Sequence, residues 1–372
     1  MDNLSHSLAG LALSRAGLNR ITPRATLLLL LSANIPDSDI VALFKGQLSY
    51  LEVHRGPTHA LLAVPILALE CVIVVAALCR QRLPWFQAWL VCCIGVLSHL
   101  LLDWTNDYGI RPFIPFSLQW FHLDLNSLTD GPILAALGLA AVWPWLSGLV
   151  SGEIGEAKKS TGQGIALAML LLCIAYDAGR YNLHQRAVTQ LESRLYAGSA
   201  PLEVAALPTP VNPFRWRGIV STKTAFLQYD LNTLAQLNTE SADSYFRIPT
   251  TESTANARKT AEFSYFLYFA RFPVWSVQPV ALSDGAGKRI ELTDLRFGEP
   301  GQGAFHCVAD ENPDGKVIAS WFTYGNGADL GWNDPRSKHQ RADFIARPDF
   351  RPQCGGSLAV DLPDRCRFGR RP

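Results

Sequence analysis

Long apolar runs dominate the first half of the chain, and shorter alternating runs dominate the second half. Residues 60–79 and 83–102 each form an apolar run of about 20 residues, which at helical rise spans the roughly 30 Å hydrocarbon core of a bilayer. Residues 132–150 and 162–181 repeat this pattern. The pattern therefore predicts four membrane-spanning helices.

Two shorter apolar runs, residues 4–18 and 26–35, precede the first predicted span. Each is too short to cross the bilayer as a helix. A basic turn with Arg20 and Arg24 joins them. We expect a short helical hairpin that enters the membrane only part of the way, because such segments are tolerated where they pack on protein or line a polar cavity.

The second half of the chain changes to strand-like patterns from Pro208 onwards. β-branched and aromatic residues alternate or cluster over residues 219–230, 244–248, 262–270, 275–282, 289–297, 304–308 and 316–324. Turn signals at 283–285 and 312–315 separate some of these runs. They predict a mostly antiparallel sheet of about seven strands.

The expected fold class is therefore α + β, in three parts. Residues 1–182 are expected to form a polytopic transmembrane helical domain that carries the site. Residues 183–207 are expected to form an amphipathic linker helix. Residues 208–372 are expected to form a soluble, β-rich domain.

Composition supports this division. The whole chain has a formal net charge of +1 and 17% charged residues, which gives no support for a nucleic-acid partner because such proteins carry a basic patch. Residues 1–182 hold only roughly one third of the Lys, Arg, Asp and Glu residues. That half is therefore expected to have the lipid bilayer as its partner.

Basic residues near the spans predict the orientation. Arg80 and Arg82 follow the first predicted span, and Lys158 and Lys159 follow the third. Four spans put both loops on the same side, which the positive-inside rule makes cytoplasmic. The chain is therefore expected to be a multi-pass protein of the inner membrane with a periplasmic C-terminal domain.

The eight cysteines contain no CxxC pair. Five of them lie in apolar runs and are expected to be small buried hydrophobic residues. If the C-terminal domain faces an oxidising compartment, Cys354 and Cys366 can close a short loop through a disulfide.

Candidate chemistry gathers just before the first span, in the segment His-Arg-Gly-Pro-Thr-His at 54–59. Two imidazoles and a guanidinium beside hydrocarbon are costly and therefore need partners. His99 and Asp103 lie near the far end of the second span, and their i, i+4 spacing puts them on one helix face. Five of the eight histidines fall within the first 122 residues, so the clustering points to a metal site.

Neutral imidazoles and carboxylates are typical ligands of Zn²⁺, Mn²⁺ or Fe²⁺. We expect a divalent cation, Zn²⁺ first, with Mn²⁺ or Fe²⁺ as alternatives. The candidate ligands, sufficient for two ions that activate a water, are His6, Asp37, Asp39, His54, His59, His99 and Asp103. Two residues are expected to have catalytic roles: Asp39 as ligand or base, and Arg55 as a bidentate partner for phosphate or carboxylate.

Each of these candidates also has a simpler interpretation. Residues 36–39 can form an Asp-rich turn or cap, and His99 with Asp103 can be a pair that only packs helices. Arg55 can pair with a neighbouring Asp, and Thr58 is expected to cap a helix rather than bind a ligand. Three loop positions are expected to be ordinary polar groups rather than ligands: His122, Asp124 and Asp130.

At these residues the sequence resembles the bacterial membrane-bound metal-dependent hydrolases of the inner membrane. The resemblance covers roughly residues 1–150 and rests on these features: His6, Pro-Asp-x-Asp at 36–39, His-Arg-Gly-x-Thr-His at 54–59, and His-x-x-x-Asp at 99–103 followed by Thr105 and Gly109. That family is similar in outline to zinc-dependent phospholipase C, which also uses His-x-x-x-Asp for metal. The resemblance implies a metal-dependent hydrolase of phospholipid or another phosphoester.

Two functional hypotheses follow from these patterns. The first is a hydrolase with a small-molecule or lipid substrate; serine-nucleophile and NTP-driven chemistry are not expected, because the sequence has no Gly-x-Ser-x-Gly elbow and no Gly-rich phosphate loop. The second is non-enzymatic, with the His/Asp cluster as a metal or proton site of a transporter or as a structural anchor for the β domain. Glu70, near the middle of the first span, favours transport.

Overall fold

A computed structural model describes residues 1–154, 162–238, 241–282, 285–300 and 303–325. All of them belong to one structural unit, Met1–Asp329. Lys158, Lys159, Cys354 and Cys366, on which two of the predictions rest, lie outside the described residues.

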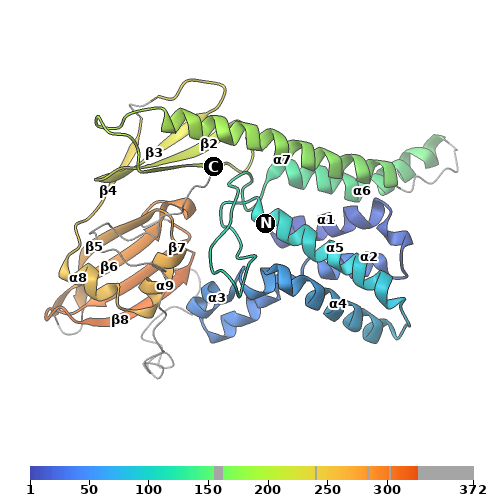
Figure 1. Cartoon of the computed structure of the whole chain (residues 1–372), viewed down its shortest axis with the longest axis horizontal. Helices are drawn as coiled ribbons and strands as arrows, with labels where there is room; N and C mark the ends of the chain where they lie inside the picture. The colour runs from blue at the N-terminus through green and yellow to red at the C-terminus, as the bar shows by residue number, and fades with distance from the viewer. Residues whose placement is uncertain (155–161, 239–240, 283–284, 301–302, 326–372) are drawn as a thin grey trace. The chain divides into compact units, whose positions relative to one another are not determined.

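The first half of the chain is helical. Its elements are α1 (Asn3–Arg15), η1 (Leu18–Arg20), α2 (Ala25–Ser32), η2 (Ile35–Lys45), α3 (Gln47–Val53), η3 (Pro57–His59), η4 (Leu61–Ala63), α4 (Val64–Cys79), α5 (Trp85–Trp104), α6 (Gly131–Ile154) and α7 (Gln163–Glu192), where η marks a 3₁₀ helix. Figure 1 shows α4 and α5 side by side, with α2 packed against both.

Four segments are long and apolar enough to cross a membrane: Leu61–Cys79, Trp85–Trp104, Gly131–Gly148 and Gln163–Glu192. In each segment only 11% to 39% of an 18-residue apolar stretch is buried within the protein. Low burial of apolar residues is expected for helices that face lipid. The four predicted spans are therefore confirmed. The predicted N-terminal hairpin is also present, because α1 packs against α2.

The second half contains two antiparallel four-stranded sheets within the described residues. The first has the order β1 (Glu203–Pro208), β2 (Arg215–Ser221), β3 (Ala225–Asn232) and β4 (Asp243–Phe246). The second has the order β5 (Pro273–Leu282), β6 (Gly285–Asp294), β7 (Phe305–Glu311) and β8 (Val317–Tyr324). Three short helices accompany them: α8 (Glu252–Ala257), α9 (Ala261–Phe269) and η5 (Leu295–Phe297).

Shared apolar cores connect these sheets to the helices. The end of α7 packs Leu191 against Trp216 of the first sheet. The helix α9 packs Phe263 and Phe266 against the second sheet, and that core also includes Tyr108 from the helical half. The helical and β halves are therefore joined by packed side chains as well as by the chain itself.

Several sequence-based boundaries differ from the structure. The single strand expected over 219–230 is part of the β2–β3 hairpin, and β1 was not predicted. The strand expected over 262–270 is the helix α9, because Thr260 caps it by accepting from Phe263 N–H and its buried aromatic residues repeat at helical spacing. No separate linker helix exists over 183–207: α7 continues to Glu192, and β1 begins at Glu203.

Candidate metal centre

The two carboxylates of residues 36–39 lie on the 3₁₀ helix η2. The sequence allowed residues 36–39 to form an Asp-rich turn or cap. The structure instead places them in a 3₁₀ helix that follows the end of α2 at Ser32, and Pro36 lies in its first turn, where its missing N–H costs nothing. Asp39 is buried and Asp37 is half-buried, so both face the protein.

Four side chains from three parts of the chain converge on one point. Potential ligand atoms of Asp37, His59, His99 and Asp103 all lie within 4.8 Å of one another. His59 Nε2 is 3.1 Å from His99 Nε2 and 3.3 Å from Asp103 Oδ2. Asp37 Oδ1 lies 3.7 and 3.6 Å from the same two nitrogens.

The outer nitrogens of the two imidazoles determine their tautomers. His99 Nδ1 lies 2.7 Å from the Ala33 carbonyl oxygen, which can only accept, so Nδ1 carries the proton. Thr58 Oγ1 donates to Asp39 Oδ2, so its oxygen accepts from His59 Nδ1 at 3.0 Å. Both Nε2 atoms are then acceptors that face each other. Such a pair is repulsive unless a cation lies between them.

The carboxylate of Asp103 contacts different groups with its two oxygens. Oδ1 accepts from Arg55 Nη2 at 3.0 Å and contacts the Met1 amine. Oδ2 is buried and accepts no hydrogen bond from any described residue, although both imidazole nitrogens lie close to it. An orphaned buried carboxylate oxygen beside two nitrogen lone pairs fits a divalent cation.

Burial keeps the histidines near η3 neutral. It holds the pKa of His59 well below the usual range, with nearby His99 adding to the effect. Burial also lowers the pKa of His54, although the hydrogen bond to Asp39 opposes it. Neutral imidazole is the form that binds metal.

A second group of possible ligands shares one carboxylate with the first. Asp37, Asp39 and His54 also have ligand atoms within 4.8 Å of one another. His54 Nδ1 is 3.0 Å from Asp39 Oδ1, while Asp39 Oδ2 accepts from Arg55 N–H and Thr58 at 3.1 Å each. Because Asp37 belongs to both groups, it is placed to bridge two cations.

His6 and Arg55 lie beside these groups. The His6 ring stacks on His99 with centroids 3.7 Å apart, and its Nε2 is 3.4 Å from Asp103 Oδ1, but it belongs to neither group. Arg55 donates from one Nη to Asp103 and from the other to Asn106. This matches the alternative in which Arg55 pairs with a neighbouring Asp.

Sequence analysis did not identify Asn106 as a site residue. Its side-chain oxygen accepts from Arg55 and from the backbone N–H groups of Tyr108 and Gly109, at 2.9–3.2 Å. Tyr108 places its ring 4.6 Å from the Arg55 guanidinium. The available signal was the polar run Thr-Asn-Asp-Tyr-Gly at 105–109, which begins two residues after Asp103 of the His-x-x-x-Asp motif.

The remaining loop candidates have structural partners. His122 Nδ1 lies 3.0 Å from Asp124, which also accepts from Arg271 at 2.8 Å. Asp130 accepts from Ile133 N–H at the start of α6. None of these loop residues belongs to either ligand group within the described chain, in agreement with the simpler interpretation.

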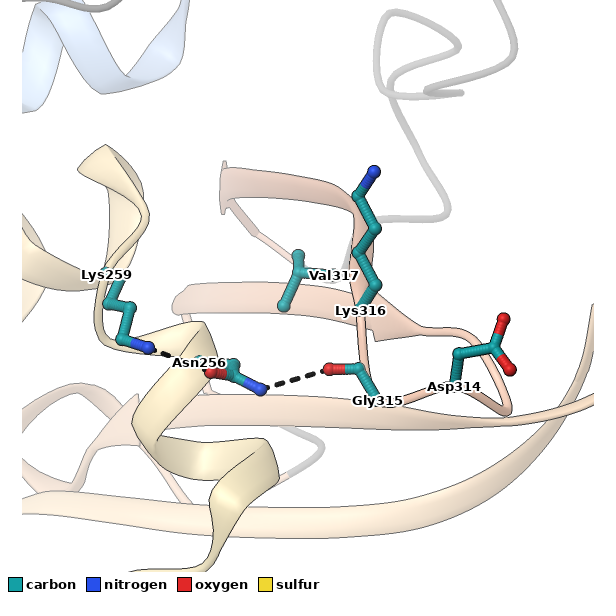
Figure 2. A pocket seen from close by; sticks show the side chains of 6 residues that line it. All are labelled: Asn256, Lys259, Asp314, Gly315, Lys316 and Val317. Carbon is teal, nitrogen blue, oxygen red and sulfur yellow. Dashed lines mark hydrogen bonds between the residues drawn. The ribbon is translucent and has the colours of Figure 1, made fainter.

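Figure 2 shows a surface depression in the β half. The lining residues are Asn256, Lys259, Asp314, Gly315, Lys316 and Val317. Lys259 donates to Asn256, which in turn donates to the Gly315 carbonyl. With two lysines and one carboxylate, this depression does not offer the ligands of a cation site.

Several known proteins are similar to this chain. Residues 1–185 match the family described as YdjM inner membrane protein. The inner membrane protein YbcI of Escherichia coli (strain K12) is 28% identical over 151 residues, covering 35% of this chain and 82% of YbcI. The uncharacterized protein YfhP of Bacillus subtilis (strain 168) is 24% identical over 336 residues, covering 86% of this chain and 94% of YfhP. No solved structure matches.

Both groups of possible ligands lie inside the matched segment. The apolar spans of the chain and its match to an inner membrane protein family support a location in the inner membrane. Over residues 1–185, just under half of its length, the chain is similar to the YdjM inner membrane protein family.

Proposed function

We propose that this chain is an inner-membrane hydrolase that depends on a divalent cation. The first cation position is made by Asp37, His59, His99 and Asp103, and the second by Asp37, Asp39 and His54. Zn²⁺ is the preferred cation because the donor set mixes imidazole and carboxylate, with Mn²⁺ or Fe²⁺ as alternatives.

One observation carries this proposal. The Nε2 atoms of His59 and His99 face each other at 3.1 Å, and each ring has its outer nitrogen engaged by an oxygen. A histidine pair that only packed helices would place a donor opposite an acceptor. Here two lone pairs and the free Oδ2 of Asp103 point to one place, which is the arrangement of metal ligands.

A bound divalent cation would supply Lewis acidity and a water acidic enough to attack an ester at neutral pH. The residues of the chain contribute position and charge. Arg55 holds Asp103 through Oδ1, and Thr58 links Asp39 to His59. Asp39 already accepts three hydrogen bonds, so we propose that it orients its neighbours and acts as ligand or base from that position.

Metal analysis of the purified protein tests the proposal. We expect one or two equivalents of a transition metal, and the loss of at least about one equivalent in His59→Ala. His306→Ala is the control, because His306 pairs with Glu291 in the β half. Hydrolysis of a panel of phosphoesters should stop on addition of a chelator. Metal-free wild type, or a His59→Ala variant with unchanged metal content, would contradict the proposal.

The non-enzymatic alternative has less support. Transport requires polar groups that line a path through several spans. Glu70, the feature that favoured it, is exposed on α4, whereas the ligand groups gather near the ends of α4 and α5. Activity on the phosphoester panel separates the two hypotheses.

We further propose that the β half is periplasmic. Arg80 and Arg82 lie at the end of α4 opposite to the His59 end, and basic residues mark the cytoplasmic side. The site and the β half share the other side, since Tyr324 of β8 donates its N–H to Gln47 of α3. Labelling of intact cells with a reagent that does not cross the membrane, at a cysteine introduced in place of Asp314, tests this orientation.

A further inference from the structure

Large apolar side chains are exposed on η2, which carries Asp37 and Asp39, and on two segments that follow η3 and α5 in the chain. We call this set the apolar rim; it consists of Ile40, Val41, Leu43 and Phe44 of η2, Leu61 and Leu62 of η4, and Phe113, Phe116 and Leu118 of the loop after α5. Phe44 is 88% exposed and Phe116 is 83% exposed. Contiguous exposed apolar groups of this kind mark an interaction surface.

The apolar rim adjoins the site through η2. Side chains three residues apart lie in one row along a 3₁₀ helix. Asp37, which belongs to both ligand groups, shares its row with exposed Ile40 and Leu43. The row of Pro36 and Asp39 faces the protein. The row that starts at the site therefore continues onto the apolar rim.

Backbone contacts connect the other two parts of the rim to the ligand segment. Leu61 N–H donates to the Pro112 carbonyl at 2.9 Å, and Arg111 N–H donates to the Arg55 carbonyl at 3.0 Å. Phe113 follows directly after Pro112. Leu61 and Leu62 are also the first residues of the candidate span Leu61–Cys79. The apolar rim is thus continuous with the start of a candidate span.

The segment η2 is too short to cross the membrane by itself, although α2 and η2 together, with a bend of 42° between them, are long and apolar enough to do so. Its eleven residues extend about 22 Å at 3₁₀ rise, less than the roughly 30 Å hydrocarbon core. Its first turn meets the end of α5, where Asp37 lies 3.6 Å from His99. Its last residue leads through Gly46 into α3, which contacts β8. Both ends of η2 therefore lie on the side of the β half.

We propose that the apolar rim is embedded in the membrane leaflet on the side of the β half, with bilayer lipid as its partner. The rim then forms a border between the acyl chains and Asp37, the more exposed of the two η2 carboxylates. An amphipathic segment that lies in the interface buries its apolar face among acyl chains and keeps polar groups at headgroup depth. Asp37 and Asp39 occupy that depth.

If the proposed hydrolase function is correct, this border also selects the substrate. An amphipathic ester whose polar head reaches Asp37 while its chains remain in the leaflet fits the arrangement. Such a substrate gains binding from its chains, and binding remote from the reacting centre can raise turnover. A water-soluble ester with the same head lacks that contribution.

Photocross-linking tests the lipid contact without requiring activity. The photoreactive residue p-benzoylphenylalanine replaces Phe44 or Phe116 in the full chain, reconstituted in vesicles of phosphatidylethanolamine and phosphatidylglycerol. Leu78, 76% exposed on α4, is the lipid-facing control, and Phe246, exposed on β4, is the control outside the spans. We expect lipid adducts at both rim positions within about threefold of the yield at Leu78, and background at Phe246. Background yield at both rim positions would overturn the proposal.

Substrate comparison tests the second part. Wild-type protein with its metal is given a phospholipid in vesicles, or the glycerophosphodiester that remains when the acyl chains are removed. We expect the phospholipid to be hydrolysed at least about tenfold faster; equal rates would reject selection by the apolar rim. If neither ester reacts, the proposed hydrolysis of phosphoesters fails, while the cross-linking result still decides whether the rim contacts lipid.

Discussion

Asp103 shows how one buried side chain is held in place at the candidate metal centre. Its Oδ1 is held by Arg55, which also lies over the Tyr108 ring. The position of Oδ2 is therefore fixed by contacts that do not involve a metal. A ligand held in this way does not have to lose conformational freedom on binding, which favours affinity.

Asp107, four residues further on, predicts a pH effect on stability. Burial, with a contribution from Asp124, raises the pKa of its carboxyl from 3.8 to about 6. Because the folded pKa is the higher one, the carboxyl contributes stability below about pH 4 that is lost as pH rises through about 6. Asp107→Asn should therefore stabilise the protein by on the order of 2 kcal/mol at pH 8 and much less at pH 4.

Thermal unfolding followed by near-ultraviolet circular dichroism measures this effect. Asp314→Asn, which changes an exposed carboxylate, is the control and should show no such difference between the two pH values. A wild type that is more stable than Asp107→Asn at pH 8 would show that the buried carboxylate has a favourable partner.

At the scale of elements, the change from α2 to η2 creates a contact of the site. In a continued α-helix, the N–H of Asp37 would bond the carbonyl of Ala33. It bonds Asn34 instead, because η2 is a 3₁₀ helix. The Ala33 carbonyl is therefore available to His99 Nδ1, and the end of one helix orients a ligand on another.

Close packing of α1 against α2 supports that contact. A Cβ at Gly10 would lie 2.7 Å from the Leu29 carbonyl oxygen and 3.1 Å from Ala33 Cβ. Gly10→Ala should therefore move the end of α2 and destabilise the protein by about 1–3 kcal/mol. The Ala33 carbonyl, which accepts from His99 Nδ1, would move with the end of α2. The site that contains His59 and His99 should therefore also retain less metal. Gly138→Ala, at a helical position with nothing within 4 Å, is the control.

The measurements are the thermal midpoint and the metal retained after dialysis. Gly138→Ala should be neutral or more stable, by up to about 1 kcal/mol, because Ala has the higher helix propensity. If Gly10→Ala matches that control in both measurements, the packing of α1 on α2 does not determine the position of Ala33.

At the scale of the whole molecule, the β half supports the loop that carries Asn106. Arg296, 3% exposed, pairs with Asp294 at 2.8 Å and donates to the carbonyl oxygens of Phe269 and Asp107 at 2.8 and 3.0 Å. Tyr108, which contacts Arg55, lies in the core of the second sheet. The site and the β5–β8 sheet are therefore mechanically connected.

Arg296→Met should reveal this connection. The change leaves the buried carboxylate of Asp294 without its charged partner, which should cost about 3–5 kcal/mol. It should also weaken metal retention, since the Asp107 carbonyl loses its donor. Arg289→Met is the control, because Arg289 is half-exposed in its pair with Asp310 and such pairs contribute at most about 1 kcal/mol. Adding Asp294→Asn to Arg296→Met should restore part of the stability; no restoration would show that the buried charge is not the cause.

The sequence by itself determined the membrane helices and the candidate ligands. Span length depends only on the number of consecutive apolar residues, so the ranges 60–79 and 83–102 were predictable without a fold. Imidazoles and carboxylates beside apolar runs are equally visible in one dimension. The strand predicted over 262–270 was wrong, because the prediction rested on aromatic content, whereas the aromatic residues that become buried repeat at helical spacing.

Only the tertiary structure decided what these groups do together. The sequence did not show that Asp37 belongs to both ligand groups, that Arg55 turns to Asp103, or that His6 stacks on His99 outside both. Each of these outcomes depends on packing between residues far apart along the chain, such as Ala33 against His99. Local patterns select which residues are available, and long-range packing selects which of their atoms meet.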